Sequence, residues 1–311
     1  MGRDNMNYAQ PTDETGRLEA RYSAFLETIT NLRPILHRYC ARMTGSVMDG
    51  EDVVQEALFE AYRKLDKFDD SRPLKPWLFR IAHNRCIDFL RKRGVRVEAE
   101  TAAMDSDAVE AIEPAGLELG RAVEHLVTSL PPKERACVLL KDVFDYSLEE
   151  IAELVDSTVG GVKAALNRAR TKLAASPAPT RRSRMVDPEL TRILELYVGR
   201  FNRRDWDGVR ELISADARLT VADAFTGKLA DAPYFRNYER RPTPWKLVVG
   251  ELDSELVVII MQRGVDTWTP YSVVYLDLAG HQIDHIRDYS HCPWLISAAG
   301  SVAVSVSPVQ R

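Results

Sequence analysis

Apolar residues recur at helical spacing over most of the first 175 positions of the chain. Between residues 18 and 44 they predict helix, which we expect Pro34 to break or kink into two helices because proline cannot continue the hydrogen-bond ladder. A second stripe runs from Asp49, a plausible N-cap, to Leu65. A third begins near Trp77, so this part of the chain is predicted to be all-α.

The third helix has two unlike faces. Its apolar face, with Leu78 and Cys86 among its members, is typical of a side that packs into a core. From this stretch alone we favour an ordinary amphipathic helix whose other face is basic and solvated. Nucleic acid is the alternative, since cations can follow phosphate while short polar side chains reach base edges. That face carries Arg80, His83, Asn84, Ile87, Asp88 and Arg91.

An acidic segment then interrupts the apolar periodicity. No Lys or Arg lies between Arg96 and Arg121, while Asp and Glu accumulate and small residues dominate. This composition predicts a flexible linker and a domain boundary.

The next segment carries a helix-turn-helix pattern. Ser147 and Glu150 form a capping box ahead of a short apolar helix, and a tight turn leads to a second helix over residues 158–173. The second helix contains no acid. Because the capping box, the turn length and the acid-free helix coincide, we favour a DNA-reading helix over a plain helical hairpin. Its outward residues are Lys163, Asn167, Arg168, Arg170, Thr171 and Lys172.

After a Pro-, Ser- and Arg-rich stretch, two amphipathic helices precede a series of strand-like runs. Helices followed by strands predict an α+β domain whose helices pack on one curved face of an antiparallel sheet. Ala279-Gly280 is expected to turn a hairpin between the last two runs. The runs are Arg218–Ala222, Trp245–Glu251, Leu256–Gln262, Tyr271–Leu278 and His281–Arg287.

Charge and cysteine usage narrow the class of protein. A formal net charge of −4 over 311 residues confines any nucleic-acid contact to local basic faces. The four cysteines are scattered without a C-x-x-C pair, which favours a reducing compartment and argues against disulfides or a zinc site. With no signal-peptide or membrane-spanning pattern, we expect a cytoplasmic protein without a resident metal or cofactor.

Two blocks of sequence resemble the extracytoplasmic-function family of bacterial RNA polymerase sigma factors. Residues 49–65 with 73–93 are similar to the family's region 2, and residues 130–173 to its region 4. The resemblance implies a dissociable polymerase subunit that binds the β′ clamp and β flap of the core enzyme and recognises promoter DNA. It implies polymerase contacts for Asp52, Gln55 and Glu56.

The same resemblance assigns promoter contacts. In the −10 element it implies Arg80, Asn84, Asp88 and Arg91. In the −35 element it implies Lys163 and Asn167 as base readers, with Arg168, Arg170 and Lys172 on phosphate. Trp77 fits a core edge better than a base stack, and Arg85 is expected to pair internally with an acid.

The last domain is similar to SnoaL-like folds, on the strength of residues 201–219 and 286–289. The resemblance implies a cone-shaped α+β domain that contacts regions 2 and 4 as a built-in regulator. A pocket for a small apolar ligand is possible, with Trp245, Trp268, His285 and Asp288 as its candidates. A metal pair of His281 and His285 is conceivable, an Asp/His acid–base pair is unsupported, and we assign no catalytic residue.

The predicted organisation therefore has seven parts. They are a disordered N-terminus (1–17), region 2 (18–95), an acidic linker (96–118), region 4 (119–175), a second linker (176–187), the SnoaL-like domain (188–300) and a tail (301–311). Two other functions stay open: a helix-turn-helix regulator that acts without polymerase, and a SnoaL-type enzyme with a DNA-binding half.

Overall fold

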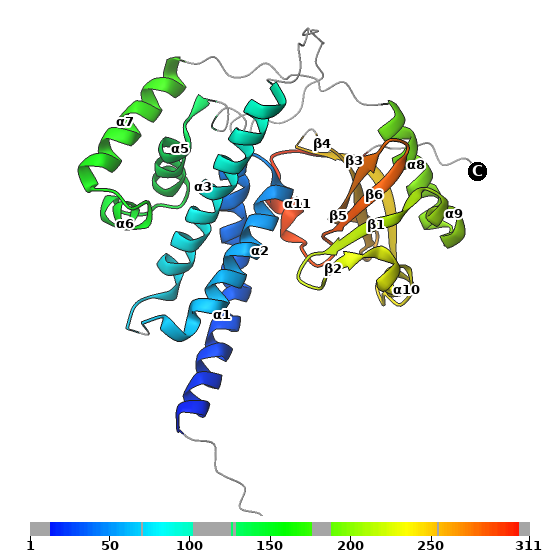
Figure 1. The fold of residues 1–311 in the computed structure, drawn as a ribbon, viewed down its shortest axis with the longest axis horizontal. Coiled ribbons are helices and arrows are strands. Elements are labelled where there is room, and N and C mark those ends of the chain that lie inside the picture. The colour runs from blue at the N-terminus through cyan, green and yellow to red at the C-terminus, as the bar shows by residue number, and fades with distance from the viewer. Residues whose placement is uncertain are drawn as a thin grey trace, which may run out of the picture.

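The computed structural model describes residues 13–69, 71–101, 126, 129–175, 188–253 and 255–304. Figure 1 shows two helical parts followed by a sheet with helices on both sides. We call them the first helical module (residues 13–101), the second helical module (129–175) and the C-terminal domain (188–304).

The first helical module contains three long helices: α1 (Asp13–Thr44), α2 (Val47–Lys64) and α3 (Leu74–Thr101), with a 3-10 turn over Leu65–Lys67. The predicted break at Pro34 is wrong, since α1 is one element through that residue. A proline inside a helix costs about 3 kcal/mol. Burial of Phe25 before it and of Leu36 and Tyr39 after it, all in one core, offsets that cost.

Two helix ends differ from the prediction. Ser46, rather than Asp49, caps α2, because its hydroxyl accepts a hydrogen bond from the backbone N–H of Asp49. Helix α3 starts at Leu74 and continues to Thr101, so residues 96–101 of the expected linker are helical. The rest of that linker lies outside the described residues, as does the linker over 176–187.

The second helical module comprises α5 (Pro132–Val138), a π-helical turn (Leu139–Val143), α6 (Leu148–Leu154) and α7 (Val159–Ala175). The predicted capping box is confirmed, with Ser147 and Glu150 each bonding the other's backbone N–H. Helices α6 and α7 form the predicted helix-turn-helix, and Val162, Leu166 and Ala169 are buried as expected.

The C-terminal domain contains all five predicted strands and both predicted helices, with two further strands, two further helices and a 3-10 turn. Its helices are α8 (Pro188–Asn202), α9 (Trp206–Glu211), α10 (Tyr234–Glu239) and α11 (Trp294–Ala298), with a 3-10 turn over Leu229–Asp231. Its strands are β1 (Ile213–Val221), β2 (Phe225–Lys228), β3 (Trp245–Leu252), β4 (Glu255–Arg263), β5 (Trp268–Ala279), β6 (Gln282–Asp288) and β7 (Val302–Val304). Strand β7 lies in the segment expected to be a tail.

The seven strands form one sheet in the order β2-β1-β6-β5-β4-β3-β7. The prediction of an antiparallel sheet needs correction at one place, because β1 and β6 pair in parallel. Strands β5 and β6 form the expected hairpin, and Gly280 adopts the positive φ of 62° that this turn requires.

Each face of the sheet has its own core. Helices α8 to α10 cover the inner face, where Tyr197, Phe201 and Trp245 are buried. The outer face packs against α11 and against the first helical module, which covers it with Ala41, Val47 and Met48 (Figure 1). We expected helices on one face only, so this second contact is a finding of the structure.

Candidate nucleic-acid and protein interfaces

The side chains predicted to contact the −10 element lie along one side of α3. Arg80, Asn84 and Arg91 are exposed and Asp88 is half-buried. Arg91 donates to Asp88 Oδ1 at 3.0 Å, an exposed pair one turn apart that contributes at most about 1 kcal/mol. The four residues therefore share an open face on which the pair can exchange for contacts with nucleic acid.

His83 does not belong to that face, although its helical position suggested that it does. It is buried, and its Nδ1 lies 2.8 Å from the Tyr39 hydroxyl of α1. Burial, helped by the nearby Lys133 charge, lowers the pKa of His83 to about 4. The side chain is thus neutral at physiological pH and belongs to the core.

Trp77 and Arg85 lie where the sequence favoured. The Trp77 ring is partly buried against Phe68, with ring centroids 4.7 Å apart. Arg85 donates to Glu60 of α2. The internal pairing expected for Arg85 is therefore confirmed, and Trp77 lies at the edge of the core.

The predicted −35 residues all lie on exposed positions of α7. Lys163 and Asn167 face outward. The three predicted phosphate cations bind acids within the module. Arg168 and Lys172 donate to Glu134 at 2.8 and 2.9 Å, and Arg170 donates to Asp142 at 3.1 Å.

Glu134, which pairs with two of these cations, has a shifted pKa. Hydrogen bonds from Lys172 and Arg168 hold the pKa of Glu134 below its usual range. The Arg168 and Lys172 side chains remain 57% and 44% exposed, so phosphate can compete with the carboxylate for them. The face retains its basic character in either case.

Aromatic side chains join the two helical modules. Phe144 of the second module lies 5.8 Å from Tyr39 and 5.9 Å from Phe79 of the first, measured between ring centroids. Arg135 donates to the Met43 carbonyl across the same boundary. Burial lowers the pKa of Arg135 to about 10, so it stays charged. The two modules share one core.

The C-terminal domain covers two of the three predicted polymerase contacts on α2. Tyr289 donates its hydroxyl to Asp52 Oδ1 at 3.2 Å, and Arg287 Nη1 lies 3.9 Å from Asp52 Oδ2. Gln55 donates to Asp223 Oδ1 at 3.2 Å. Glu56, the third, is exposed.

The same junction raises the pKa of one of those carboxyl groups, that of Asp52. Burial between α2 and the sheet raises the pKa of Asp52 to about 6, against the opposing effects of the Arg287 charge and the Tyr289 hydrogen bond. The Asp52 side chain still keeps 42% of its surface exposed, so we expect solvent to screen part of this effect.

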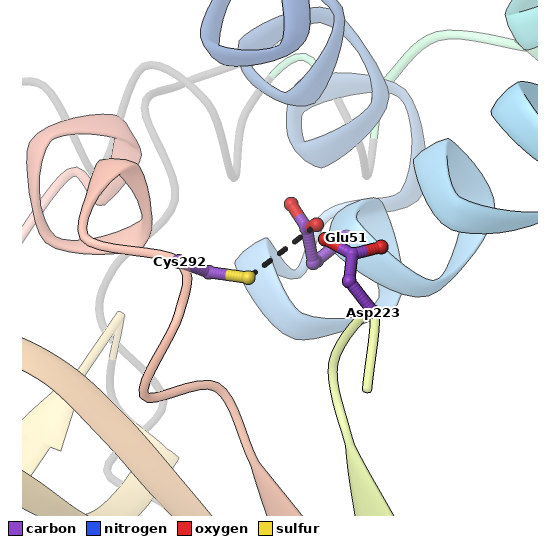
Figure 2. A group of neighbouring side chains, drawn as sticks. All are labelled: Glu51, Asp223 and Cys292. Atoms are coloured by element: carbon purple, nitrogen blue, oxygen red, sulfur yellow. Dashed lines mark hydrogen bonds between the residues drawn. The ribbon is translucent and has the colours of Figure 1, made fainter. Parts of the chain in front are cut away.

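A buried ion network lies beside these contacts. Arg33 of α1 pairs with Glu51 of α2 and, at 2.7 Å, with Asp223 of the C-terminal domain. Glu51 also accepts a hydrogen bond from the Trp294 indole at 2.7 Å and from the Cys292 thiol at 3.6 Å. Figure 2 shows Cys292 pointing at Glu51, with Asp223 approaching from the turn after β1.

Glu51, Asp223 and Cys292 come close enough to suggest a metal site, since their ligand atoms lie within 4.8 Å of one another. The Arg33 guanidinium already forms ion pairs with both carboxylates. Burial raises the pKa of the Cys292 thiol, whereas a metal needs the thiolate. We therefore interpret the cluster as a charged junction between α1, α2 and the C-terminal domain.

Apolar contacts surround that network. Ala41, Val47 and Met48 of the first helical module share a core with Leu252 of β3 and Leu295 of α11. Four interface residues were not identified from the sequence: Arg33, Tyr289, Cys292 and Trp294. A helix face or a strand end has the same sequence pattern whether it packs against its own domain or against another.

The four candidates for a ligand pocket do not line one site. Trp245 and Asp288 lie on the inner side, where Tyr238 links them: its carbonyl accepts from Trp245 at 3.0 Å and its hydroxyl donates to Asp288 at 2.6 Å. Trp268 packs on the outer face, and His285 contacts Thr220 and Asp277. The alternation of side chains along the strands separates the two pairs.

His281 and His285 do not form a metal pair either. His281 lies in the turn before β6, exposed, with its Nδ1 3.0 Å from Glu189. Since β6 begins one residue later, the two histidines do not share the strand periodicity that the prediction assumed.

Among the described helices, no stretch is both long and apolar enough to cross a bilayer.

Comparisons with known proteins bear on both helical modules. Residues 28–96 match the family model Sigma-70 region 2, and residues 120–173 match Sigma-70, region 4. The chain is 27% identical to the ECF RNA polymerase sigma factor SigG of Mycobacterium tuberculosis, over 89% of this chain and 82% of SigG. It is 35% identical to the ECF RNA polymerase sigma factor SigW of Bacillus subtilis, over 48% of this chain and 87% of SigW.

Among solved structures, the extracytoplasmic function sigma factor SigJ of Mycobacterium tuberculosis is similar over 85% of this chain and 95% of its own, at 18% identity and a TM-score of 0.35.

Proposed function

The chain belongs to the extracytoplasmic-function (ECF) family of RNA polymerase sigma factors, and we propose that its C-terminal domain controls its access to core polymerase by covering helix α2. As a sigma factor, the protein serves promoter recognition in transcription initiation. The observation that carries the proposal is that Asp52 and Gln55 are bonded to Tyr289 and Asp223 of the C-terminal domain. Polymerase and this domain would compete for one surface.

On this proposal, α3 and α7 read the two promoter elements. Arg80, Asn84, Asp88 and Arg91 would contact the −10 element. Lys163 and Asn167 would read base edges in the −35 element, while Arg168, Arg170 and Lys172 would leave their acids for phosphate. The exposure of these side chains supports the assignment.

Promoter binding would also separate the two helical modules. Elements centred near −10 and −35 lie about 25 base pairs apart, or about 85 Å along B-DNA. Modules whose aromatic rings lie 5.8 Å apart cannot reach both elements at once. We therefore propose that this arrangement is a closed form, in which the C-terminal domain covers part of the polymerase-binding surface and α3 and α7 are held too close together to reach both promoter elements.

We assign the C-terminal domain to the SnoaL-like class, with helices against the concave face of a curved sheet. It would act as a regulator within the chain, without a catalytic step. The network around Glu51 would be the main polar contact of the closed form, because it joins two helices of the first module to the domain.

Core-polymerase affinity tests the proposal. The double variant Asp223→Asn with Trp294→Ala removes two of the domain's polar contacts with α1 and α2 and changes neither helix. We expect it to bind core polymerase at least about tenfold more tightly than the native chain, because the native chain must first open and its apparent affinity is reduced by the small open fraction. Equal affinities, with both chains active in run-off transcription, would show that the domain does not compete with polymerase.

A further inference from the structure

The C-terminal domain covers only one half of the outward face of α2. One side of the helix carries five residues that follow one another at intervals of one or three positions: Asp52, Gln55, Glu56, Phe59 and Tyr62. The first two contact the C-terminal domain. From Glu56 onward the face is open, over about 10 Å of helix length.

The open half carries large apolar side chains at high exposure. Phe59 is 65% exposed and Tyr62 is 50% exposed, and Leu26 of the neighbouring α1 is 58% exposed. The Tyr22 ring of α1 lies 5.2 Å from that of Tyr62. Because α1 and α2 run antiparallel, this contact and the Arg33–Glu51 pair place Leu26 at about the level of Phe59 along the two helices. We call Leu26, Phe59 and Tyr62 the aromatic patch.

This patch is unusual for the described part of the chain. Five large apolar side chains are conspicuously exposed there, and three of them form the patch. The other two, Val143 and Val265, are far from each other in sequence and smaller. Clustered exposed apolar groups on a soluble helix pair indicate a surface that another protein covers.

We propose that the aromatic patch is where core polymerase first contacts the closed protein, before the C-terminal domain leaves α2. The inference rests on the proposed function, since it takes α2 as the polymerase-binding helix. Polymerase is the proposed partner because the patch continues the side of α2 that carries Asp52 and Gln55. Binding to the open half would bring polymerase to the edge of the covered half, where its further contacts shift the equilibrium toward the open form.

The patch therefore should matter most when the protein is closed. In the closed chain polymerase has only the open half of α2 for its initial contact. In an opened chain the whole face is available, and losing two side chains removes a smaller part of the encounter surface. Loss of the patch should therefore slow the association of polymerase with the closed chain more than with an opened chain, in addition to any change in affinity.

The test compares association rate constants for core polymerase across full-length variants at one salt concentration. Phe59→Ala with Tyr62→Ala (the patch variant) removes the two aromatic side chains of the patch. Asp223→Asn with Trp294→Ala releases the C-terminal domain from α2. Val265→Ala, at a position 96% exposed in the C-terminal domain, is the control for removal of an exposed apolar group. Because the patch residues are exposed, their loss should not unfold α2.

We expect the patch variant to slow association at least about tenfold in the native background and less than about threefold in the opened background. The control should change neither rate. Equal slowing in both backgrounds, or none, would overturn the proposal. Should sedimentation instead reveal a dimer of the native chain that the patch variant dissolves, a second copy is the occupant and the proposal is likewise overturned.

These outcomes are separate from those of the proposed function. If opening the domain leaves polymerase affinity unchanged, competition for α2 fails regardless of the patch. If opening tightens binding but the patch variant behaves alike in both backgrounds, competition stands and the ordered displacement fails.

Discussion

Replacing Trp294 with alanine should release the C-terminal domain from α2. The indole N–H donates to the buried Glu51 carboxylate at 2.7 Å, and the ring lies 5.1 Å from the Arg33 guanidinium carbon. A hydrogen bond to a charged group is worth about 2 kcal/mol. The cation–π contact adds about 1 kcal/mol. Their sum of about 3 kcal/mol corresponds to a shift of roughly 150-fold in the ratio of closed to open forms.

Cys292 provides the assay for this shift. Its thiol is fully buried between the sheet and α2 in the closed form, and it becomes accessible when the domain leaves. The rate of maleimide labelling at Cys292 in the native, full-length chain, followed by peptide mass spectrometry, therefore reports the open fraction. The label on Cys292 is distinguished by its peptide from labels on Cys40, Cys86 and Cys137. We expect Trp294→Ala to accelerate labelling by about two orders of magnitude.

Trp206→Ala is the matched control, because it also removes an indole that donates to a glutamate of the chain. Its partner, Glu239, belongs to the C-terminal domain, and neither residue touches the first helical module. This variant should leave the labelling rate within about threefold of the native value. Similar acceleration in both variants, or a Trp294→Ala rate close to native, would refute the role given to the Glu51 network.

Three further predictions concern the proposed DNA-contacting residues of α3 and α7 and the carboxyl group of Asp52. Arg80→Glu with Asn84→Ala should abolish promoter melting, measured by permanganate footprinting, while core-polymerase affinity stays native; weakened core binding would contradict the assignment. Lys163→Ala and Asn167→Ala should each weaken holoenzyme binding to a duplex −35 element roughly 5- to 150-fold, from the 1–3 kcal/mol typical of a base contact; an unchanged affinity would argue against these readers. Closure raises the pKa of Asp52 to about 6, so the closed form binds a proton more tightly than the open form. The population of the closed form should therefore grow as pH falls through 6 toward 4, by less than tenfold because Asp52 is partly exposed. The radius of gyration from small-angle scattering measures this change. A radius that is independent of pH in this range, or that still changes with pH in Asp52→Asn, would contradict the prediction.

Local patterns of the sequence predicted the helical modules well. The capping box of Ser147 and Glu150 and the acid-free helix behind it depend on neighbours within a few residues, so the pattern alone defines them. The five predicted strands were found for the same reason. The path of α1 through Pro34 was not predictable, since burial on both sides of the proline outweighs its local preference.

The contact between the C-terminal domain and α2 depends on residues more than 160 positions apart, such as Gln55 and Asp223. One signal for it was present in β4. Residues 256–261 read LVVIIM, an apolar run without alternation, and such runs are typical of strands buried on both faces. That run indicated a second cover on the sheet, but not that α1 and α2 provide it. The four pocket candidates do not line one site, because Trp268 and His285 lie on that covered face while the other two lie on the inner face.

A reversible cross-link between α2 and the C-terminal domain would test the account most directly. Gln55 and Asp223 are hydrogen-bonded at 3.2 Å, so cysteines at the two positions can be joined by a short, cleavable bis-maleimide in the full-length chain. We predict that the cross-linked protein does not bind core polymerase and that cleaving the linker restores the binding of the unlinked variant. Equal binding before and after cleavage would contradict the claim that the C-terminal domain and polymerase compete for α2.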